Sequence, residues 1–165
     1  MESNDVVALF CENARKVDAA VTVVDSLDEA AKTIDKIVRD SDKVYAPRLT
    51  PKEKDLQLRE SLLTTDYYEA TVTVEEAVAG IAETGSIVCW SKEGRPLQAS
   101  VLPGRHVVIL SRENIVADLD AFFDRLGSDI PTNMTFITGP SRTADIELTL
   151  TTGVHGPEFV HIVIV

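Results

Sequence analysis

Short runs of β-branched and apolar residues alternate along the chain with longer stretches whose apolar positions recur every three or four residues. The short runs predict strands, and most are apolar at consecutive positions, as strands covered on both faces must be. Seven runs have this character, at 20–24, 43–46, 70–73, 86–90, 106–110, 134–138 and 160–165. All except the third are expected to be strands of one sheet.

Capping patterns mark where the longer stretches begin. A Ser or Thr followed three residues later by Glu forms a capping box, in which each side chain bonds a free backbone N–H of the first turn. The pattern occurs at 26–29, 50–53 and 73–76. Apolar spacing predicts two more helices, over about residues 4–17 and from Ile115 to Leu126, the second ended by Gly127. Strand and helix alternation of this kind predicts an α/β fold, a mostly parallel sheet in three α/β/α layers, within a single domain over residues 1–165.

Composition narrows the possible partners. The chain of 165 residues has 16 Lys and Arg against 27 Asp and Glu, a net charge of −11. Nucleic acid and anionic membranes both require a basic face, so we expect neither as a partner. No apolar run approaches the roughly 20 residues of a membrane-spanning helix, and residues 1–16 lack the pattern of a secretory signal. The two cysteines form no disulfide framework, which favours a cytoplasmic location.

Several familiar sites are excluded by their spacing. Gly80 and Gly85 have the glycine spacing of a phosphate-binding loop, but the lysine is missing and a predicted strand follows in place of a helix. His155, Glu158 and His161 match no metal-binding pattern, so we expect no metal site. Two cysteines are too few for an iron–sulfur cluster, and there is no G-x-S-x-G nucleophile motif. We therefore expect no cofactor in this chain.

One candidate site remains, around two Gly-Pro turns near the end of the chain. Residues 134–138 predict a strand, 139–142 a turn, and a helix is expected to begin near Thr143. Ligands of α/β sheets bind beyond the carboxyl ends of strands, and Arg142 adds a fork suited to a carboxylate or phosphate. The alternative is that Ser141 or Thr143 only caps the helix and that Arg142 pairs with Asp145 or Glu147.

The second turn, at 153–157, contains His155. This side chain could act as a general acid or base or contact a ligand, or it could be a turn histidine bonded to backbone. If both turns meet the segment at 82–86, they form a pocket for a small anion. The ligand-binding candidates are Thr84, Gly85, Gly139, Pro140, Ser141, Arg142, Thr143, Asp145, His155 and Gly156.

Four of these segments resemble a known family. AETGS (82–86), LPGRHVVIL (102–110), ITGPSRTADIE (137–147) and GVHGP (153–157) are similar in order and spacing to the lactate utilization protein C family (LutC/YkgG, or LUD domain, formerly DUF162). The match runs from about Thr73 to the C-terminus, whereas the first ~70 residues match only in their style of secondary structure.

The resemblance implies a fold similar to the NagB/RpiA/CoA-transferase group. It also implies a role in the oxidation of L-lactate to pyruvate, beside partner subunits that carry iron–sulfur clusters. This chain lacks the cysteines for such a cluster, so its own role would be non-redox: assembly, ligand binding or regulation. The family pattern does not settle the catalytic residues.

Two other functions stay open. Glu83-Thr84-Gly85 resembles the nucleophilic glutamate loop of CoA transferases, which suggests a stand-alone enzyme of the CoA-transferase or phosphosugar-isomerase type. Glu83 and His155 are then the catalytic candidates. The third reading is a ligand-sensing module without chemistry.

Overall fold

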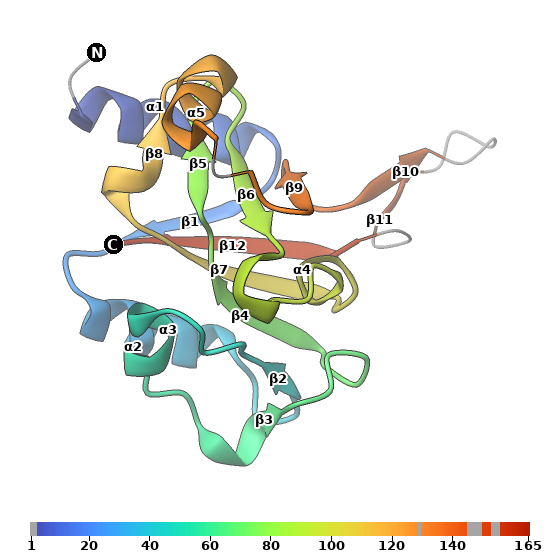
Figure 1. The fold of residues 1–165 in the computed structure, drawn as a ribbon. Helices are drawn as coiled ribbons and strands as arrows, with labels where there is room; N and C mark the ends of the chain where they lie inside the picture. Colours follow the sequence, from blue (N-terminus) through green and yellow to red (C-terminus); the bar gives the residue numbers. More distant parts are fainter. Residues whose placement is uncertain (1–2, 129, 145–149, 153–155) are drawn as a thin grey trace.

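The computed structural model describes residues 3–128, 130–144, 150–152 and 156–165. A six-stranded sheet runs through the middle of the molecule in the order β1-β12-β7-β4-β2-β3, and every neighbouring pair in it is parallel (Figure 1). Its strands are β1 (Ala20–Val23), β2 (Val44–Tyr45), β3 (Leu63–Thr64), β4 (Val72–Glu76), β7 (Arg105–Leu110) and β12 (Phe159–Ile164). Their carboxyl ends therefore meet at one edge of the sheet.

A second sheet and a separate hairpin hold the other strands. The four-stranded sheet has the order β8-β5-β6-β9 and mixes one parallel with two antiparallel pairs. Its strands are β5 (Ala79–Ile81), β6 (Ser86–Trp90), β8 (Ile115–Val116) and β9 (Met134–Ile137). The strands β10 (Arg142–Ala144) and β11 (Leu150–Thr152) pair with each other and project away from the two sheets (Figure 1).

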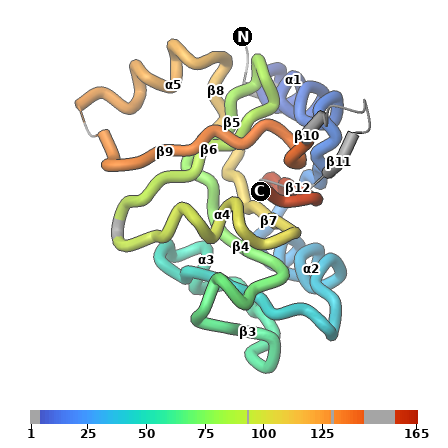
Figure 2. Tube along the Cα trace, turned by 90° about the vertical axis from the view of Figure 1, so that its right-hand side faces the viewer, coloured from blue at the N-terminus to red at the C-terminus, as the bar shows by residue number. Residues whose placement is uncertain are grey.

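Helices lie on both sides of the six-stranded sheet. The turned view places α2 and α3 on one side, and α1 and α5 with the second sheet on the other (Figure 2). The helical elements are α1 (Ser3–Lys16), α2 (Leu27–Ile37), α3 (Pro51–Asp55), α4 (Gln98–Val101) and α5 (Leu119–Leu126), with short 3₁₀ turns at Glu60–Leu62, Lys92–Gly94 and Arg112–Asn114. No helix in these described ranges is both long and apolar enough to cross a bilayer.

The core follows the two-residue period of the central strands. In β7, Val107 and Ile109 belong to the cluster under α2, whereas Val108 and Leu110 belong to the cluster under α1 and β6. All four are fully buried. Because successive side chains of a strand point to opposite faces, a doubly covered strand must be apolar throughout, as the sequence of β7 is.

The predicted α/β class and mostly parallel central sheet are confirmed, and each predicted strand overlaps an observed one. The prediction of a single sheet is wrong, because β6 and β9 belong to the second sheet. The capping boxes at 26–29 and 50–53 do begin helices: Ser26 Oγ accepts from Glu29 N, and Thr50 and Glu53 form the complete box.

Three predicted helix starts are wrong. Residues 73–76 lie in β4, where Val72 and Val74 are fully buried between neighbouring strands. Ile115 lies in β8 and pairs with Gly80, so α5 begins only after its N-cap, Asp118. The sequence predicts a helix near Thr143, but this segment is the strand β10, which pairs with β11. The threonines of both strands favour extended structure.

Candidate functional site

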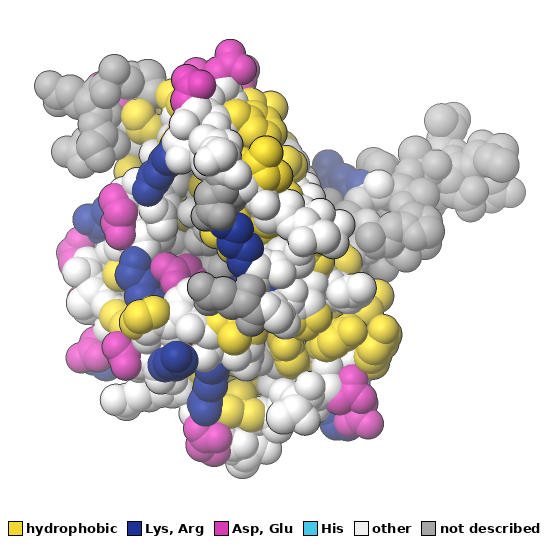
Figure 3. Space-filling view, viewed as in Figure 1, with side chains coloured by type: hydrophobic (Ala, Val, Ile, Leu, Met, Phe, Trp, Pro, Cys, Tyr) yellow, Lys and Arg dark blue, Asp and Glu magenta, His cyan; other side chains and the backbone are white. Residues whose placement is uncertain are grey.

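A cavity of about 250 Å³ opens at the carboxyl edge of the parallel sheet. It follows the ends of β4 and β7 and is lined by Thr50, Glu76, Ala77, Val78, Trp90, Lys92, Arg95 and Asn114. The space-filling view shows this face hollowed near its middle, with basic and acidic side chains around the hollow (Figure 3). Ligands of α/β proteins bind at this edge because connecting loops leave crevices there. We call this space the carboxyl-edge cavity.

Arg95 is the cavity residue with the most unusual surroundings. It follows the 3₁₀ turn after β6, and its side chain is only 6% exposed. Its Nη1 donates to Glu53 Oε1 at 2.7 Å and to Glu75 Oε2 at 2.9 Å. Its Nε and Nη2 have no partner within the part of the chain that the structure describes. One edge of the guanidinium is thus fixed and the other is unused.

Glu53 is held by backbone donors as well as by Arg95. Its Oε2 accepts from the backbone N–H groups of Leu49 at 2.7 Å and Thr50 at 3.2 Å, which is one half of the capping box of α3. Its Oε1 accepts from the N–H of Glu76 at 2.8 Å. The carboxylate therefore ties the start of α3 to the end of β4, and its negative charge is shared among several donors.

Glu75 has an equally complete set of partners. Its Oε1 accepts from Ser100 Oγ at 2.5 Å and from His106 Nε2 at 2.8 Å. Burial alone would raise the pKa of Glu75, but the hydrogen bond from His106, the charge of Arg95 and the bond from Ser100 outweigh it and hold the pKa at about 2. Glu75 is consequently ionised at neutral pH although none of its surface is exposed.

The same cluster has the composition of a metal site but not its chemistry. Ligand atoms of Glu75, Cys89 and His106 lie within 4.8 Å of one another. Burial and the charge of Glu75 raise the pKa of the Cys89 thiol well above its usual range, so the thiolate that a metal needs is disfavoured. Arg95 already occupies Glu75, and a second cation there would be repelled. Glu75 and His106 are therefore part of the polar network around Arg95, and Cys89 lies beside them as a neutral thiol.

The rim of the cavity adds further donors. Lys92 Nζ lies 4.5 Å from the centroid of the Trp90 ring. Asn114 Oδ1 accepts from Arg125 Nη2 at 2.8 Å, which leaves the Asn114 amide nitrogen as a donor. Lys52 Nζ bonds Ser111 Oγ and lies 3.5 Å from Glu76 Oε1 and from Glu113 Oε1. Among the described residues that line the cavity, Lys92 and Arg95 are basic and only Glu76 is acidic.

The candidates predicted from sequence lie elsewhere, around the C-terminal end of α1. Gly85 has φ +68, and a Cβ there would lie 2.2 Å from the backbone nitrogen of Ala14. Gly139 has φ +69, and its Cβ would lie 2.0 Å from the carbonyl oxygen of Val17. Asn13 Nδ2 donates to the carbonyl oxygens of Ala82 and Glu83, at 2.8 and 3.1 Å. Both glycines therefore allow close backbone contact with α1.

The structure does bring the predicted turns together. A chain of hydroxyl bonds joins Thr84 to Ser86 at 2.6 Å and Ser86 to Thr138 at 2.7 Å. The N–H of Ser141 donates to the carbonyl of Pro157 at 2.8 Å, and a Cβ on Gly156 would lie 3.0 Å from that of Ser141.

The charged candidates there divide into three groups. Arg142 pairs with Asp18, and both side chains are about half exposed. Glu83 is exposed. Asp145, Glu147 and His155 lie outside the described residues, as do the side chains of Thr143 and its neighbours up to 155. Arg142 and Glu83 do not line the carboxyl-edge cavity.

Sequence reasoning missed Arg95 and its two carboxylates. These three residues come from α3, β4 and the segment after β6, so no local motif joins them. One signal was available: Glu75 lies within a run whose other members, Val72 to Val74, suit a buried strand. A carboxylate inside such a strand requires a buried cationic partner.

Comparison with known proteins identifies the family. The sequence model of the LUD domain matches residues 42–165, more than half of the chain. The chain belongs to the LUD domain family. The resemblance noted from AETGS and ITGPSRTADIE is confirmed.

Curated relatives of this LUD protein are lactate utilization proteins C. The protein of Exiguobacterium sp. is 37% identical over 102 residues, which are 58% of this chain and 44% of that protein. The protein of Halalkalibacterium halodurans is 28% identical over 94% of this chain and 76% of its own length. In the first of these matches the shared segment spans less than half of the relative.

A solved structure supports the fold. The crystal structure of a DUF162 family protein from Deinococcus radiodurans superposes with a TM-score of 0.77 and covers 99% of this chain and 98% of that one. The two sequences are 17% identical, so the likeness concerns the fold alone.

Proposed function

We propose that this LUD protein is a non-redox component of a lactate utilization system and binds a small carboxylate, L-lactate first of all, in the carboxyl-edge cavity. The observation that carries the proposal is the unused edge of Arg95. Arg95 lines the cavity. Its Nη1 is fixed by Glu53 and Glu75, while its Nε and Nη2 have no partner among the described residues. A planar carboxylate fits two parallel guanidinium N–H groups.

The two buried carboxylates do not prevent an anion from binding. Each accepts other donors, Glu53 from three backbone N–H groups and Glu75 from Ser100 and His106. Arg95 is therefore not the sole neutralising group for either one. They also fix the guanidinium in position before the ligand arrives, which reduces the ordering cost of binding. The amide nitrogen of Asn114, which has no partner among the described residues, offers a donor to the lactate hydroxyl oxygen.

The redox step belongs to other subunits in this proposal. Cys11 and Cys89 are buried, and burial raises the pKa of each thiol. Iron–sulfur clusters are bound by thiolates, which generally number four. We therefore assign the clusters to partner subunits, as the resemblance to the lactate utilization protein C family implies. We propose the cytoplasm as the location of this component, since its two cysteines form no disulfide framework.

Residues 1–165 act as one unit in this account. The family match begins at residue 42, but β1 pairs with β12 and α1 contributes Phe10 and Ala14 to the main core. The first forty residues thus complete the sheet and the core of the family domain.

Calorimetric titration tests the ligand. We expect L-lactate to bind wild-type protein, and Arg95→Lys to weaken binding by at least about tenfold, because lysine keeps the charge but loses the two-pronged geometry. Arg105→Lys is the matched control, since Arg105 also forms an inward ion pair, with Asp42 at 2.6 Å, but does not line the cavity. Thermal melting of both variants checks their folding.

The outcomes separate the competing functions. Equal affinity of lactate for wild type and Arg95→Lys, or no binding of any small carboxylate, contradicts the proposed site. Binding of acetyl-CoA with transfer of its acyl group favours the transferase alternative instead.

The partner subunits need a separate experiment. Co-expression with cysteine-rich iron–sulfur proteins encoded beside this chain should give a stable complex on size-exclusion chromatography. Elution as separate species contradicts that part.

A further inference from the structure

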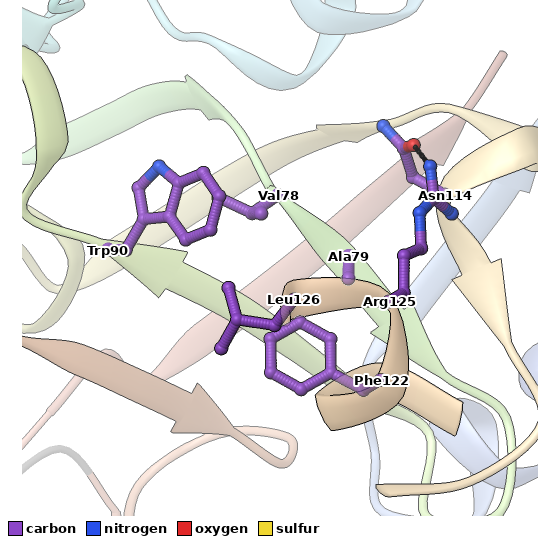
Figure 4. Close-up of a pocket in the computed structure, with 7 residues that line it drawn as sticks. All are labelled: Val78, Ala79, Trp90, Asn114, Phe122, Arg125 and Leu126. Atoms are coloured by element: carbon purple, nitrogen blue, oxygen red, sulfur yellow. Dashed lines mark hydrogen bonds between the residues drawn. The ribbon is translucent and has the colours of Figure 1, made fainter. Parts of the chain in front are cut away.

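A second cavity, of about 270 Å³, adjoins the first. It is lined by Val78, Ala79, Trp90, Asn114, Phe122, Arg125 and Leu126, and Figure 4 shows these side chains facing one space between α5 and the strands β5 and β6. Val78, Trp90 and Asn114 line both cavities. The two spaces are therefore compartments of one groove, which we call the extended groove.

The extended groove is larger than a three-carbon acid needs. Its two compartments measure about 270 and 250 Å³, and small-molecule sites usually measure roughly 300–1,000 Å³. Lactate bound at Arg95 would fill only the carboxyl-edge compartment. A ligand with a longer body would extend into the second compartment.

The second compartment differs in chemistry from the first. Val78, Phe122 and Leu126 give it apolar walls, and none of the described residues that line it is acidic. Phe122 and Leu126 project from one face of α5 toward Val78 and Trp90 (Figure 4). Arg125 is held by Asn114 Oδ1 and by the carbonyl oxygen of Glu113, both at 2.8 Å. An apolar tail, aromatic or branched, suits these walls.

We propose that the extended groove binds a carboxylic acid with an apolar tail, of the aryl-substituted 2-hydroxy acid class. The carboxylate lies on Arg95 and the tail lies among Val78, Trp90 and Leu126. The position of the carboxylate rests on the proposed function, whereas the tail compartment is an independent claim about α5 and β6.

Trp90 gives a direct readout, because it is the single tryptophan of the chain and lines both compartments. Its fluorescence is titrated with three compounds. L-lactate has the carboxylate alone, L-3-phenyllactate has the carboxylate and the aromatic tail, and 2-phenylethanol has the aromatic tail without the carboxylate. Phenyllactate should bind at least about tenfold more tightly than lactate, because binding buries its ring against the apolar walls of the second compartment. Phenylethanol should bind more weakly than phenyllactate, because it has no carboxylate for Arg95.

Two leucine variants locate the tail. Leu126→Ser should bring the affinity for phenyllactate down toward that for lactate, while lactate binding stays unchanged. Leu102→Ser is the matched control, because Leu102 is exposed and does not line the groove. We expect the control to bind both acids like wild type.

Each result bears on a definite claim. If lactate binds and phenyllactate binds no more tightly, the tail compartment is overturned while the proposed function stands. If phenyllactate binds tightly but Leu126→Ser has no effect, the tail lies elsewhere and the inference is again overturned. If phenyllactate binds Arg95→Lys as tightly as it binds wild type, the carboxylate does not lie on Arg95. If neither acid binds, both claims fail.

Discussion

Replacing Glu75 by Gln tests whether the buried ion pair stabilises the fold as the geometry requires. The change keeps the shape of the side chain but removes its charge and sets an amide against a guanidinium. Glu75 has no exposed surface and lies 2.9 Å from Arg95 Nη1. Breaking a buried pair on one side typically costs roughly 3–5 kcal/mol.

The pKa of Glu75 gives a second value for the same quantity. The pKa is about 2 in the folded protein against an ordinary 4.5, a difference that corresponds to about 3 kcal/mol. Because the folded pKa is the lower one, this stability is present above pH 4.5 and is lost as the pH falls toward 2. By pH 3, roughly 2 kcal/mol of it should be gone.

Urea unfolding at pH 7 and pH 3 measures both effects. Glu75→Gln should lower the free energy of unfolding by about 3 kcal/mol at pH 7, and the gap to wild type should narrow by roughly 2 kcal/mol at pH 3. Glu69→Gln is the matched control: its ion pair with Lys43 is more than half exposed, so at most about 1 kcal/mol is expected. A loss below about 1 kcal/mol for Glu75→Gln, or a gap that does not change with pH, refutes the reasoning.

Three further predictions follow from the turns and the cysteines. Gly139→Ala should destabilise the protein by more than about 2 kcal/mol in thermal melts, because it combines a left-handed backbone with a clash against Val17. Gly94→Ala, with φ +81 but open space around it, should cost only about 1 kcal/mol of stability. If both variants lose the same stability, the close contact between Gly139 and Val17 does not contribute. Arg142→Ala should cost at most about 1 kcal/mol, because its pair with Asp18 is half exposed, and should leave lactate affinity unchanged; loss of binding would move the anion site to the Gly-Pro turns. The purified chain should be colourless after anaerobic reconstitution and desalting, and an iron–sulfur absorption band that disappears in a Cys11→Ser, Cys89→Ser double variant would contradict this.

Local patterns predicted the fold where local forces decide it. The capping boxes at Ser26 and Thr50 begin helices because each box satisfies its own backbone donors. The same pattern at Thr73 fails, because Val72 and Val74 gain more from burial in a strand next to β7 than Thr73 would gain from capping a helix. The division into two sheets could not be predicted from local patterns either, because it depends on which strands pair across long sequence distances.

The candidate site shows the same limit more strongly. Glycine-rich turns are visible in a sequence, and the structure does bring 84–86, 138–141 and 156–157 together. Gly85 and Gly139, however, serve close backbone contact with the C-terminal end of α1 and the residue after it, and Gly156 lies against Ser141. Arg95, Glu53 and Glu75 carry no motif, because each is supplied by a different element and only the folded sheet edge brings them within bonding distance.

A crystal structure of the protein soaked with L-lactate tests the central claim most directly. We expect a lactate carboxylate within about 2.7–3.2 Å of Arg95 Nε and Nη2, with Nη1 still bonded to Glu53 and Glu75. Lactate bound at Ser141 and Arg142, or a carboxyl-edge cavity that stays empty of lactate at saturating concentration, would contradict it.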